Sequence, residues 1–493
     1  MTEPIANTTA GQVRGVRLGD VTRFLGVPYA APPVGELRFA LPAPPVPWEG
    51  VRDATQPGAT APQRVREFPG IDVVPLIGKG DRGGDDYLNL AIWTPDVAAK
   101  GLPVMVFIHG GSFVIGAGDL AIQDGTAFTR SGVVLMAMNY RMGIDGFLPI
   151  PGVPTNLGLR DQIAALAWIK ANAAAFGGDA NNITVFGESA GAMSISDLVA
   201  SPLAQGLFQK AIIQSGHGSM VRSIEVTRRM VGTLAKTLGV TPDLAGFRST
   251  TPEQCLDAIE KAQAPGYRVN LRDADGRNPA FGLSKFLPVY GDDVLPDPPL
   301  EALAKGVGAG IKVLIGANAE EMNLYFVPTG VREKANRFLA WMLMRGSMPK
   351  AWAALKAYGM GQKGQKDGYV MGRAMGDLVF RYPVRQYAAA HQGKTHVYDF
   401  GWRSPACNGQ LGACHGMEMP FVFNTLASCT GPQGLVGEAP PQALADRIHG
   451  VWAGFAKTGT LPWPEYKAAT RQVYALADGT VDTDPDMPAA RFV

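Results

Sequence analysis

Runs of consecutive apolar residues recur along this chain, and segments with helical periodicity separate them. Each run has the length of a strand and is apolar at successive positions, as expected of parallel strands buried on both faces. The runs lie at 104–108, 133–139, 183–186, 211–214, 313–315 and 396–400. The helical segments lie at 159–176, 194–200 and 443–457. The alternation predicts an α/β fold in which helices flank a mostly parallel central sheet.

Two parts of the chain depart from this alternation. Prolines such as Pro28, Pro32 and Pro33 crowd the first hundred residues, which predicts short antiparallel strands joined by turns. Segment 329–375 contains a dense apolar patch at 338–344 between basic residues. That patch is expected to line a substrate gorge, to form a movable lid, or to pack as a helix against the sheet domain. Packing is favoured, because methionine and aromatic stripes usually fill cores.

The 493 residues read as one catalytic domain, 1–493, because no linker, charge run or low-complexity tract divides them. The formal net charge of +2 gives no basic field for nucleic acid. We see no secretory signal, and the longest apolar runs are too short to span a membrane. Four cysteines are few for a secreted chain of this size, so a cytoplasmic protein is expected. Cys407 and Cys414 are close enough in sequence to bridge, but free thiols are favoured.

One serine lies in a pentapeptide typical of a nucleophile elbow. Gly-Glu-Ser-Ala-Gly at 187–191 directly follows the apolar run 183–186, and Ser189 is its central residue. This arrangement predicts a strand, a sharp turn and a helix, with the serine hydroxyl lifted to the top of the sheet. The motif alone is weak, so its context must support it. The run 104–108 ends in His-Gly-Gly-Ser-Phe, a loop that could offer backbone N–H groups to an oxyanion.

A nucleophilic serine needs a neutral imidazole to accept its proton and an acid to orient that imidazole. In the fold that uses this elbow the order along the chain is Ser, acid, His. The chain has six histidines: His109, His217, His391, His396, His415 and His449. Of these, His415 lies far downstream in a loop of small residues and is favoured as the base. The acid is expected after run 313–315, where spacing leaves both Glu320 and Glu321 open.

Over nearly its whole length the chain resembles the type-B carboxylesterases, the α/β-hydrolase family that includes cholinesterases and bacterial p-nitrobenzyl esterases. The matching motifs are Phe-Leu-Gly-Val-Pro-Tyr-Ala at 24–30, Asn-Tyr-Arg at 139–141, Asn-Leu-Gly-Leu-Arg-Asp-Gln at 156–162, Phe-Gly-Gly-Asp at 176–179, Gln-Ser-Gly at 214–216, His-Gly-Met-Glu-Met-Pro-Phe at 415–421 and Phe-Ala-Lys-Thr-Gly at 455–459. The resemblance implies an α/β-hydrolase fold.

The resemblance also implies a role for each site residue. It assigns Ser189 as nucleophile, His415 as base and Glu321 as acid. It places an oxyanion hole at the N–H groups of Gly111, Ser112 and Ala190, with Gly110 giving the loop its turn. Glu188 and Ser215 are expected beside these residues as support.

Four positions depart from the family pattern. Met322 replaces the glycine that usually follows the acid, and Ser112 replaces a third loop glycine whose amide alone is needed. Tyr87 stands where many secreted relatives have a cysteine, and no tryptophan lies between Trp48 and Trp93, where cholinesterases bind choline. The last two departures favour a bacterial-type, intracellular, non-choline esterase.

The implied activity is hydrolysis of carboxylic esters through an acyl-enzyme on Ser189, with no metal and no cofactor. The expected partner is a small-molecule ester, with neither nucleic acid nor membrane involved, and a monomer is favoured. Carbamates, aryl amides and polyester fragments are alternative substrates for the same machinery. A non-catalytic, neuroligin-like binding protein is disfavoured, because the candidate Ser, Glu and His are all present and no anchor is seen.

Overall fold

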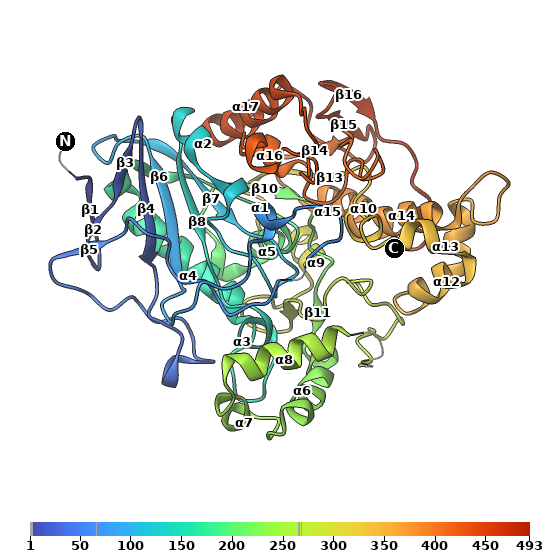
Figure 1. The fold of residues 1–493 in the computed structure, drawn as a ribbon, viewed down its shortest axis with the longest axis horizontal. Helices are drawn as coiled ribbons and strands as arrows, with labels where there is room; N and C mark the ends of the chain where they lie inside the picture. Colours follow the sequence, from blue (N-terminus) through green and yellow to red (C-terminus); the bar gives the residue numbers. More distant parts are fainter. Residues whose placement is uncertain (1–2, 66, 265–266, 268) are drawn as a thin grey trace.

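The centre of the molecule is a large mixed sheet with helices on both faces (Figure 1). It is seen in a computed structural model that describes residues 3–65, 67–264, 267 and 269–493. Within these residues the sheet has eleven strands. From one edge to the other they are β16 (Thr480–Thr483), β15 (Gln472–Ala475), β14 (Thr395–Phe400), β13 (Lys312–Asn318), β10 (Lys210–Gln214), β9 (Gly178–Glu188), β7 (Leu102–Ile108), β8 (Val134–Met138), β6 (Asn89–Thr94), β4 (Val21–Pro28) and β3 (Val16–Leu18).

The strands from β8 to β15 pair in parallel, and both edges of the sheet are antiparallel. Along β7, Val104 and Val106 face one core while Met105 and Phe107 face the other. The consecutive apolar pattern therefore reflects burial on both faces. The predicted α/β-hydrolase fold is confirmed, including its antiparallel N-terminal strands. The antiparallel pair β15–β16 at the other edge was not predicted.

Helices from distant parts of the chain cover the sheet. Residues of α4, α5 and α15 belong to the core on one face, and residues of α2, α16 and α17 belong to the core on the other. The helices, in chain order, are α1 (Val74–Ile77), α2 (Thr126–Arg130), α3 (Gly143–Phe147), α4 (Leu157–Asn172), α5 (Ala190–Ala200), α6 (Ile224–Leu238), α7 (Leu244–Arg248), α8 (Pro252–Gln263), α9 (Pro299–Ala304), α10 (Asn323–Phe326), α11 (Val331–Lys334), α12 (Arg337–Arg345), α13 (Ala351–Ala357), α14 (Asp367–Gly376), α15 (Tyr382–Ala390), α16 (Met419–Val422) and α17 (Gln442–Thr458). Two small sheets join β1 (Ile5–Thr8) to β2 (Gly11–Arg14) and β5 (Val51–Asp53), and β11 (Arg222–Ser223) to β12 (Val289–Tyr290).

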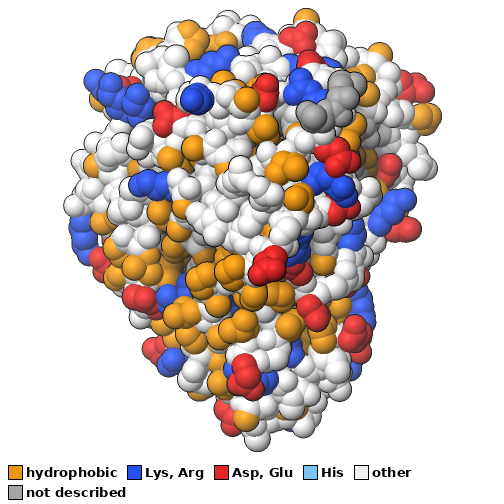
Figure 2. All heavy atoms as spheres, turned by 90° about the vertical axis from the view of Figure 1, so that its left-hand side faces the viewer, with side chains coloured by type: hydrophobic (Ala, Val, Ile, Leu, Met, Phe, Trp, Pro, Cys, Tyr) orange, Lys and Arg blue, Asp and Glu red, His pale blue; other side chains and the backbone are white. Residues whose placement is uncertain are grey.

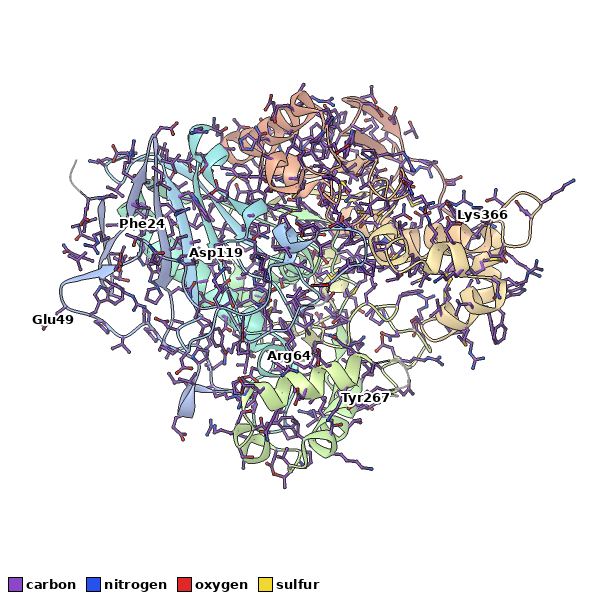
Figure 3. The ribbon with its side chains drawn as sticks, in the orientation of Figure 1. Phe24, Glu49, Arg64, Asp119, Tyr267 and Lys366 are labelled. Carbon is purple, nitrogen blue, oxygen red and sulfur yellow. The ribbon has the colours of Figure 1, made fainter. Side chains whose placement is uncertain are left out.

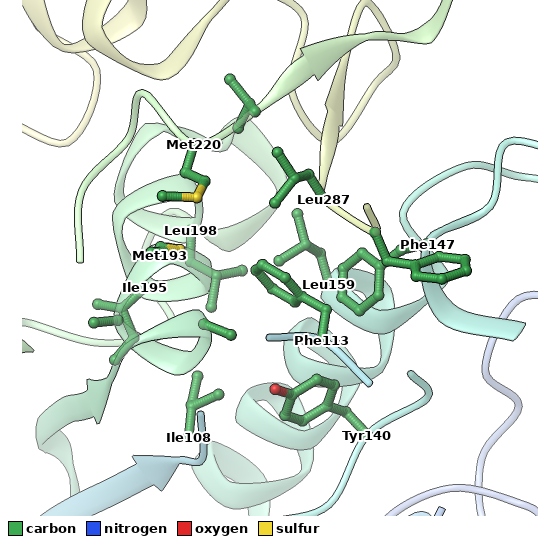
Figure 4. Close-up of a cluster of buried hydrophobic side chains, with 14 of the residues drawn as sticks. Ile108, Phe113, Tyr140, Phe147, Leu159, Met193, Ile195, Leu198, Met220 and Leu287 are labelled. Atoms are coloured by element: carbon green, nitrogen blue, oxygen red, sulfur yellow. The ribbon is translucent and has the colours of Figure 1, made fainter. Parts of the chain in front are cut away.

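The core is densely packed where β7 ends beneath α5. Ile108 lies near Met193 and Ile195, and the rings of Phe113 and Phe147 are 4.6 Å apart (Figure 4). All five side chains are nearly inaccessible to solvent. The loops above this core therefore rest on a rigid base.

A buried ion pair ties the loop after β8 to α4. Arg141 Nη2 lies 2.6 Å from Asp161 Oδ1, and neither side chain is more than 1% exposed. The carboxylate also accepts a hydrogen bond from the Arg141 backbone N–H at 3.0 Å. Removing one partner would leave a buried charge uncompensated, at a cost of about 3–5 kcal/mol.

The helical region 329–375 lies at the end of the molecule marked by α12, α13 and α14 in Figure 1. Helix α12 packs on α13 and α14, and its buried residues belong to the core on one face of the sheet. It buries Ala340 and Met344, while Phe338 is 64% exposed. The helix is apolar on most of its surface, so its pattern could not indicate which side is covered.

Acidic and basic side chains are interspersed on the face that Figure 2 shows. Among the described residues, no helix combines the length and apolar character needed to cross a bilayer. All four cysteines are free, so Cys407 and Cys414 form no disulfide bond.

Candidate active site

Ser189 occupies a strained turn between β9 and α5. Its backbone dihedrals, φ 56° and ψ −123°, are unusual for a residue with a side chain. The turn is held because the Ser189 N–H donates to Gln214 O at 2.9 Å and the Ser189 carbonyl accepts from Met193 N–H at 2.8 Å. The hydroxyl therefore projects at the carboxyl end of the parallel strands, where the elbow motif predicts it.

The two glycines of the elbow are required by the end of β7. A Cβ atom at Gly187 would lie 2.4 Å from the Ile108 carbonyl oxygen, and one at Gly191 would lie 2.0 Å from it. Both distances are far below van der Waals contact, and the obstacle is backbone that cannot rotate away. The glycines of the motif therefore allow the elbow to lie directly against the end of strand β7.

The glycine loop after β7 is bent by residues with positive φ. Gly111 has φ 111°, and a Cβ atom there would lie 2.0 Å from Ile115 O. Ser112 and Phe113 follow with φ 56° and 63°. The Ser284 hydroxyl donates to Ser112 O at 2.8 Å and fixes this bend. Gly110 passes so close to the elbow that a Cβ atom would lie 2.8 Å from Glu188 O.

Three backbone amides in this corner are available to an oxyanion. The N–H groups of Gly111 and Ser112 meet no acceptor among the described residues. Ala190 is the first residue of α5, and the N–H groups of a first helical turn have no partner within the helix. These are the amides that the resemblance assigned to the oxyanion hole, and such preorganised donors stabilise developing negative charge.

Glu321 holds the imidazole of His415. Its Oε2 lies 2.6 Å from His415 Nδ1, and Oε1 accepts hydrogen bonds from Ser215 Oγ at 2.6 Å and Asn318 N–H at 2.7 Å. The Glu321 side chain is fully buried. This set of contacts fixes the ring orientation and favours the tautomer that carries its proton on Nδ1.

Glu320 turns the other way. Its carboxylate pairs with Arg403 and accepts from Ala413 N–H at 3.0 Å. Its other oxygen accepts from Asn323 Nδ2 at 3.3 Å. The alternative that spacing left open therefore resolves in geometry, since only Glu321 reaches His415. Met322, at the departure from the family pattern, adopts an ordinary right-handed backbone with φ −73°.

The other nitrogen of the ring, His415 Nε2, lies 3.1 Å from Glu188 Oε1. No hydrogen bond joins Nε2 to the Ser189 hydroxyl in the described part of the chain. Burial lowers the pKa of His415, but the carboxylates of Glu188 and Glu321 outweigh burial and raise it to about 9. For the carboxyl group of Glu188, burial acts in the opposite direction and raises the pKa to about 8. The surroundings thus favour the imidazolium that forms when a base accepts a proton.

Sequence reasoning missed several groups around His415. Glu418 is fully buried and accepts from Gln214 Nε2 at 3.1 Å and Asn318 Nδ2 at 2.5 Å. Burial raises the pKa of its carboxyl. Phe380 covers the imidazole, with ring centroids 4.8 Å apart, from a π-helical turn at 377–381 that joins α14 to α15. Glu418 follows His415 by three residues, which was the only signal available in the sequence.

Ser189, Glu188 and His415 all line one cavity of about 110 Å³ beside the glycine loop. Its apolar lining comes largely from distant segments: Phe68, Leu76, Ile77, Leu324, Tyr325 and Met419. Segment 64–80 therefore reaches the site. Segment 329–375 lines none of this cavity within the described chain, so it forms no gorge there.

A second cavity of about 260 Å³ adjoins the first, because Gly111, Ser112 and Ile115 line both. It extends toward helix α8, alongside which Arg64 lies in Figure 3. Arg64 pairs there with Asp257 and Glu260 at 2.6 and 3.2 Å. The two cavities therefore meet at the glycine loop.

Among the described residues, no group of three or more His, Cys, Asp or Glu side chains is arranged to hold a metal ion. Fold and cavity together define the class of the protein, a serine hydrolase.

Comparison with known proteins identifies the family. A family model described as the carboxylesterase family matches residues 2–490. The para-nitrobenzyl esterase of Bacillus subtilis (strain 168) is 35% identical over 505 residues, covering 99% of this chain and 97% of that protein. The phenmedipham hydrolase of Pseudarthrobacter oxydans is 33% identical over 504 residues, covering 99% and 98%.

Solved structures agree with this assignment. A PNB esterase superposes with a TM-score of 0.84 at 32% identity over 99% of both chains. A Geobacillus stearothermophilus carboxylesterase superposes with a TM-score of 0.82 at 34% identity over 98% of both chains. The chain belongs to the carboxylesterase family, and it is a serine hydrolase of carboxylic esters that acts on small molecules.

Proposed function

We propose that Ser189, Glu321 and His415 form the catalytic triad of this esterase. The observation that supports this most directly is the 2.6 Å contact between Glu321 and His415 in the cavity that Ser189 also lines. The strained backbone at Ser189 is a second support, because strain of this kind is found at active sites.

In the proposed reaction, Ser189 Oγ attacks the ester carbonyl carbon while His415 Nε2 takes the hydroxyl proton. The resulting oxyanion accepts hydrogen bonds from the N–H groups of Gly111, Ser112 and Ala190. The C–O bond to the alcohol then breaks, and His415 gives its proton to the leaving oxygen. Water attacks the acyl-enzyme by the same route and releases the carboxylic acid. Each oxyanion donor is expected to contribute about 3–4 kcal/mol.

We propose Glu188 as a modulator of His415, since its carboxylate lies 3.1 Å from Nε2. For Nε2 to reach Ser189 Oγ, a small shift of the ring or of Glu188 is needed. Such tightening on substrate binding is common, because catalytic hydrogen bonds are often long in unliganded enzymes. Ser215 keeps Glu321 in place through its 2.6 Å hydrogen bond.

For the substrate we propose an uncharged ester with one small and one larger substituent. The cavity at Ser189 is small and largely apolar, and the larger cavity begins at the same glycine loop. A cytoplasmic location is proposed as well, on the ground that all four thiols are free.

The test is pre-steady-state hydrolysis of p-nitrophenyl esters of increasing acyl length. The wild type should release a burst of nitrophenol equal to the enzyme concentration, and Ser189→Ala should release none. Ser112→Ala is a matched control, because only its amide is proposed to act, and it should keep the burst. Matched carbamate and amide substrates run in parallel. A full burst from folded Ser189→Ala, or wild-type turnover of carbamates or amides but of no ester, would overturn the proposal.

A further inference from the structure

A third cavity, of about 380 Å³, lies behind Glu321 on the side away from Ser189. Helices α11 and α14 form two of its walls, and the segments after β13 and β14 form the others. Its lining residues include Glu320, Glu321, Arg332, Tyr369, Arg373 and Arg403. Ser189 and His415 do not line this space in the described chain, so it is separate from the catalytic cavity.

Arg332 is the unusual residue of this cavity. It is only 5% exposed, yet no carboxylate among the described residues lies within ion-pairing distance of it. Its guanidinium donates to Asn323 Oδ1 at 3.1 Å, to Gln410 O at 2.8 Å and to Gln410 Oε1 at 3.1 Å. Its Nε–H meets no acceptor in the described chain. Buried arginines are almost always paired with an anion, so a buried, permanently charged guanidinium needs an explanation.

In the described chain, the remaining neighbours of Arg332 bring no carboxylate within ion-pairing distance, although the charge of Glu333 acts on Arg332 from farther away. The ring of Tyr369 lies 4.2 Å from the guanidinium carbon, and the Tyr369 hydroxyl donates to Glu333 at 2.7 Å. Glu333 itself pairs with Lys366 at 3.1 Å. An aromatic face and carbonyl oxygens stabilise a cation only partially.

The other charges of the cavity leave it positive. Arg373 donates to Tyr358 O at 2.8 Å and has no carboxylate partner in the described chain. Arg403 is balanced by Glu320. The Glu321 oxygens are engaged by His415, Ser215 and the Asn318 N–H. Two arginines therefore lack a counter-charge around one cavity.

We propose that this cavity binds a small oxyanion, a carboxylate or a phosphate, between Arg332 and Arg373. Either group accepts the charge-assisted hydrogen bonds that arginine offers in a planar fork. A carboxylate would connect the site to the esterase reaction, since each turnover releases one, and this part of the inference rests on the proposed function. The bound anion would also link α11 and α14 across the segment that carries Glu321.

The test is direct binding of sodium phosphate and of sodium acetate, measured by titration calorimetry and by the rise in Tm at constant ionic strength. The protein is the wild type, because neither anion is an ester and the enzyme turns neither of them over. Arg373→Gln is the main variant, because Arg373 is exposed and its loss should not disturb folding. Arg332→Met is the second. Arg337→Gln, also exposed but outside the cavity, is the matched control.

We expect at least one anion to bind, Arg373→Gln and Arg332→Met to weaken it by about tenfold or more, and Arg337→Gln to leave it unchanged. Preference for acetate would identify a carboxylate site, and preference for phosphate would identify a phosphate site. The inference is overturned if neither anion binds, or if Arg373→Gln binds as well as the control. The binding readout does not depend on ester hydrolysis, so failure of the triad proposal would be seen separately in the burst assay.

Discussion

Two regions of the molecule differ in how tightly they are packed. One is the contact between the elbow and the end of β7, and the other is the helical region 329–375. At the contact between the elbow and β7, the backbone atoms lie so close together that a methyl group added at Gly191 would be 2.0 Å from a carbonyl oxygen. In the helical region, α12 leaves Phe338, Met342 and Leu343 in solvent and buries little. One region tolerates almost no change, and the other presents apolar side chains that the described residues leave largely exposed.

This difference explains why the structure of the first region could be predicted from the sequence better than that of the second. Close backbone contact demands particular small residues at fixed spacing, and such a demand appears as a motif. Helix α12 fully buries only Ala340 and Met344 among its described residues, with Leu339 and Trp341 partly buried, so it demands apolar residues at a few positions and no particular motif. Substitutions in each region test this difference.

The largest effect is expected from Glu321→Gln. The amide keeps the size of the side chain but cannot stabilise the imidazolium or hold the required tautomer, so kcat/KM should fall about 10⁴-fold. Steady-state hydrolysis of p-nitrophenyl acetate measures this. Glu320→Gln is the adjacent control and should change kcat/KM far less, because Glu320 faces Arg403. Equal losses in both variants would contradict the assignment.

Gly191→Ala should come next. The new Cβ atom would push the end of β7, and with it the oxyanion loop, away from Ser189. Misplacement of about 1 Å can cost about 100-fold in kcat, and overpacking should lower Tm as well. The control is Gly232→Ala in α6, where a Cβ atom meets nothing within 4 Å and Tm should not fall. If Gly191→Ala matched this control, the steric account of the elbow would be wrong.

A smaller effect is expected from Glu188→Gln, seen in the pH profile. Glu188 and Glu321 together raise the pKa of His415 to about 9 against the opposing effect of burial. Loss of one carboxylate lowers that pKa, so His415 becomes neutral, and able to act as a base, at lower pH. The acid limb of kcat/KM should move down by about one pH unit. An unmoved limb, or a shift to higher pH, would rule out this influence of Glu188.

The smallest effect is expected on α12. Changing both Phe338 and Met342 to serine should alter the free energy of unfolding by about 0.5 kcal/mol or less, because both side chains are exposed. Met344→Ala in the same helix should cost about 2–5 kcal/mol, since Met344 is fully buried. Urea denaturation measures both. A large loss in the serine variant would mean that the exposed face of α12 is covered in solution.

The sequence predicted the structure best where close backbone contacts permit only glycine. The elbow at 187–191 and the loop at 109–113 were readable because their glycines have no substitute in those positions. The choice between Glu320 and Glu321 was not readable from spacing, because it depends on how the turn after β13 directs two adjacent side chains. The cavity behind Glu321 was equally hidden, since Arg332, Arg373 and Arg403 come from three separate segments.

The π-helical turn at 377–381 determines how α14 and α15 are rotated relative to each other about the helix axis. An α-helix turns by about 100° per residue, so one extra residue in a turn rotates everything beyond it by that angle. Through this turn, α14 presents Arg373 to the cavity behind Glu321 while α15 presents Tyr387 to the core. Phe380 emerges at the point of rotation, over His415. Removing one residue there would turn one half of the helix away from its partners. The packing over His415 therefore depends on a single residue of helical register.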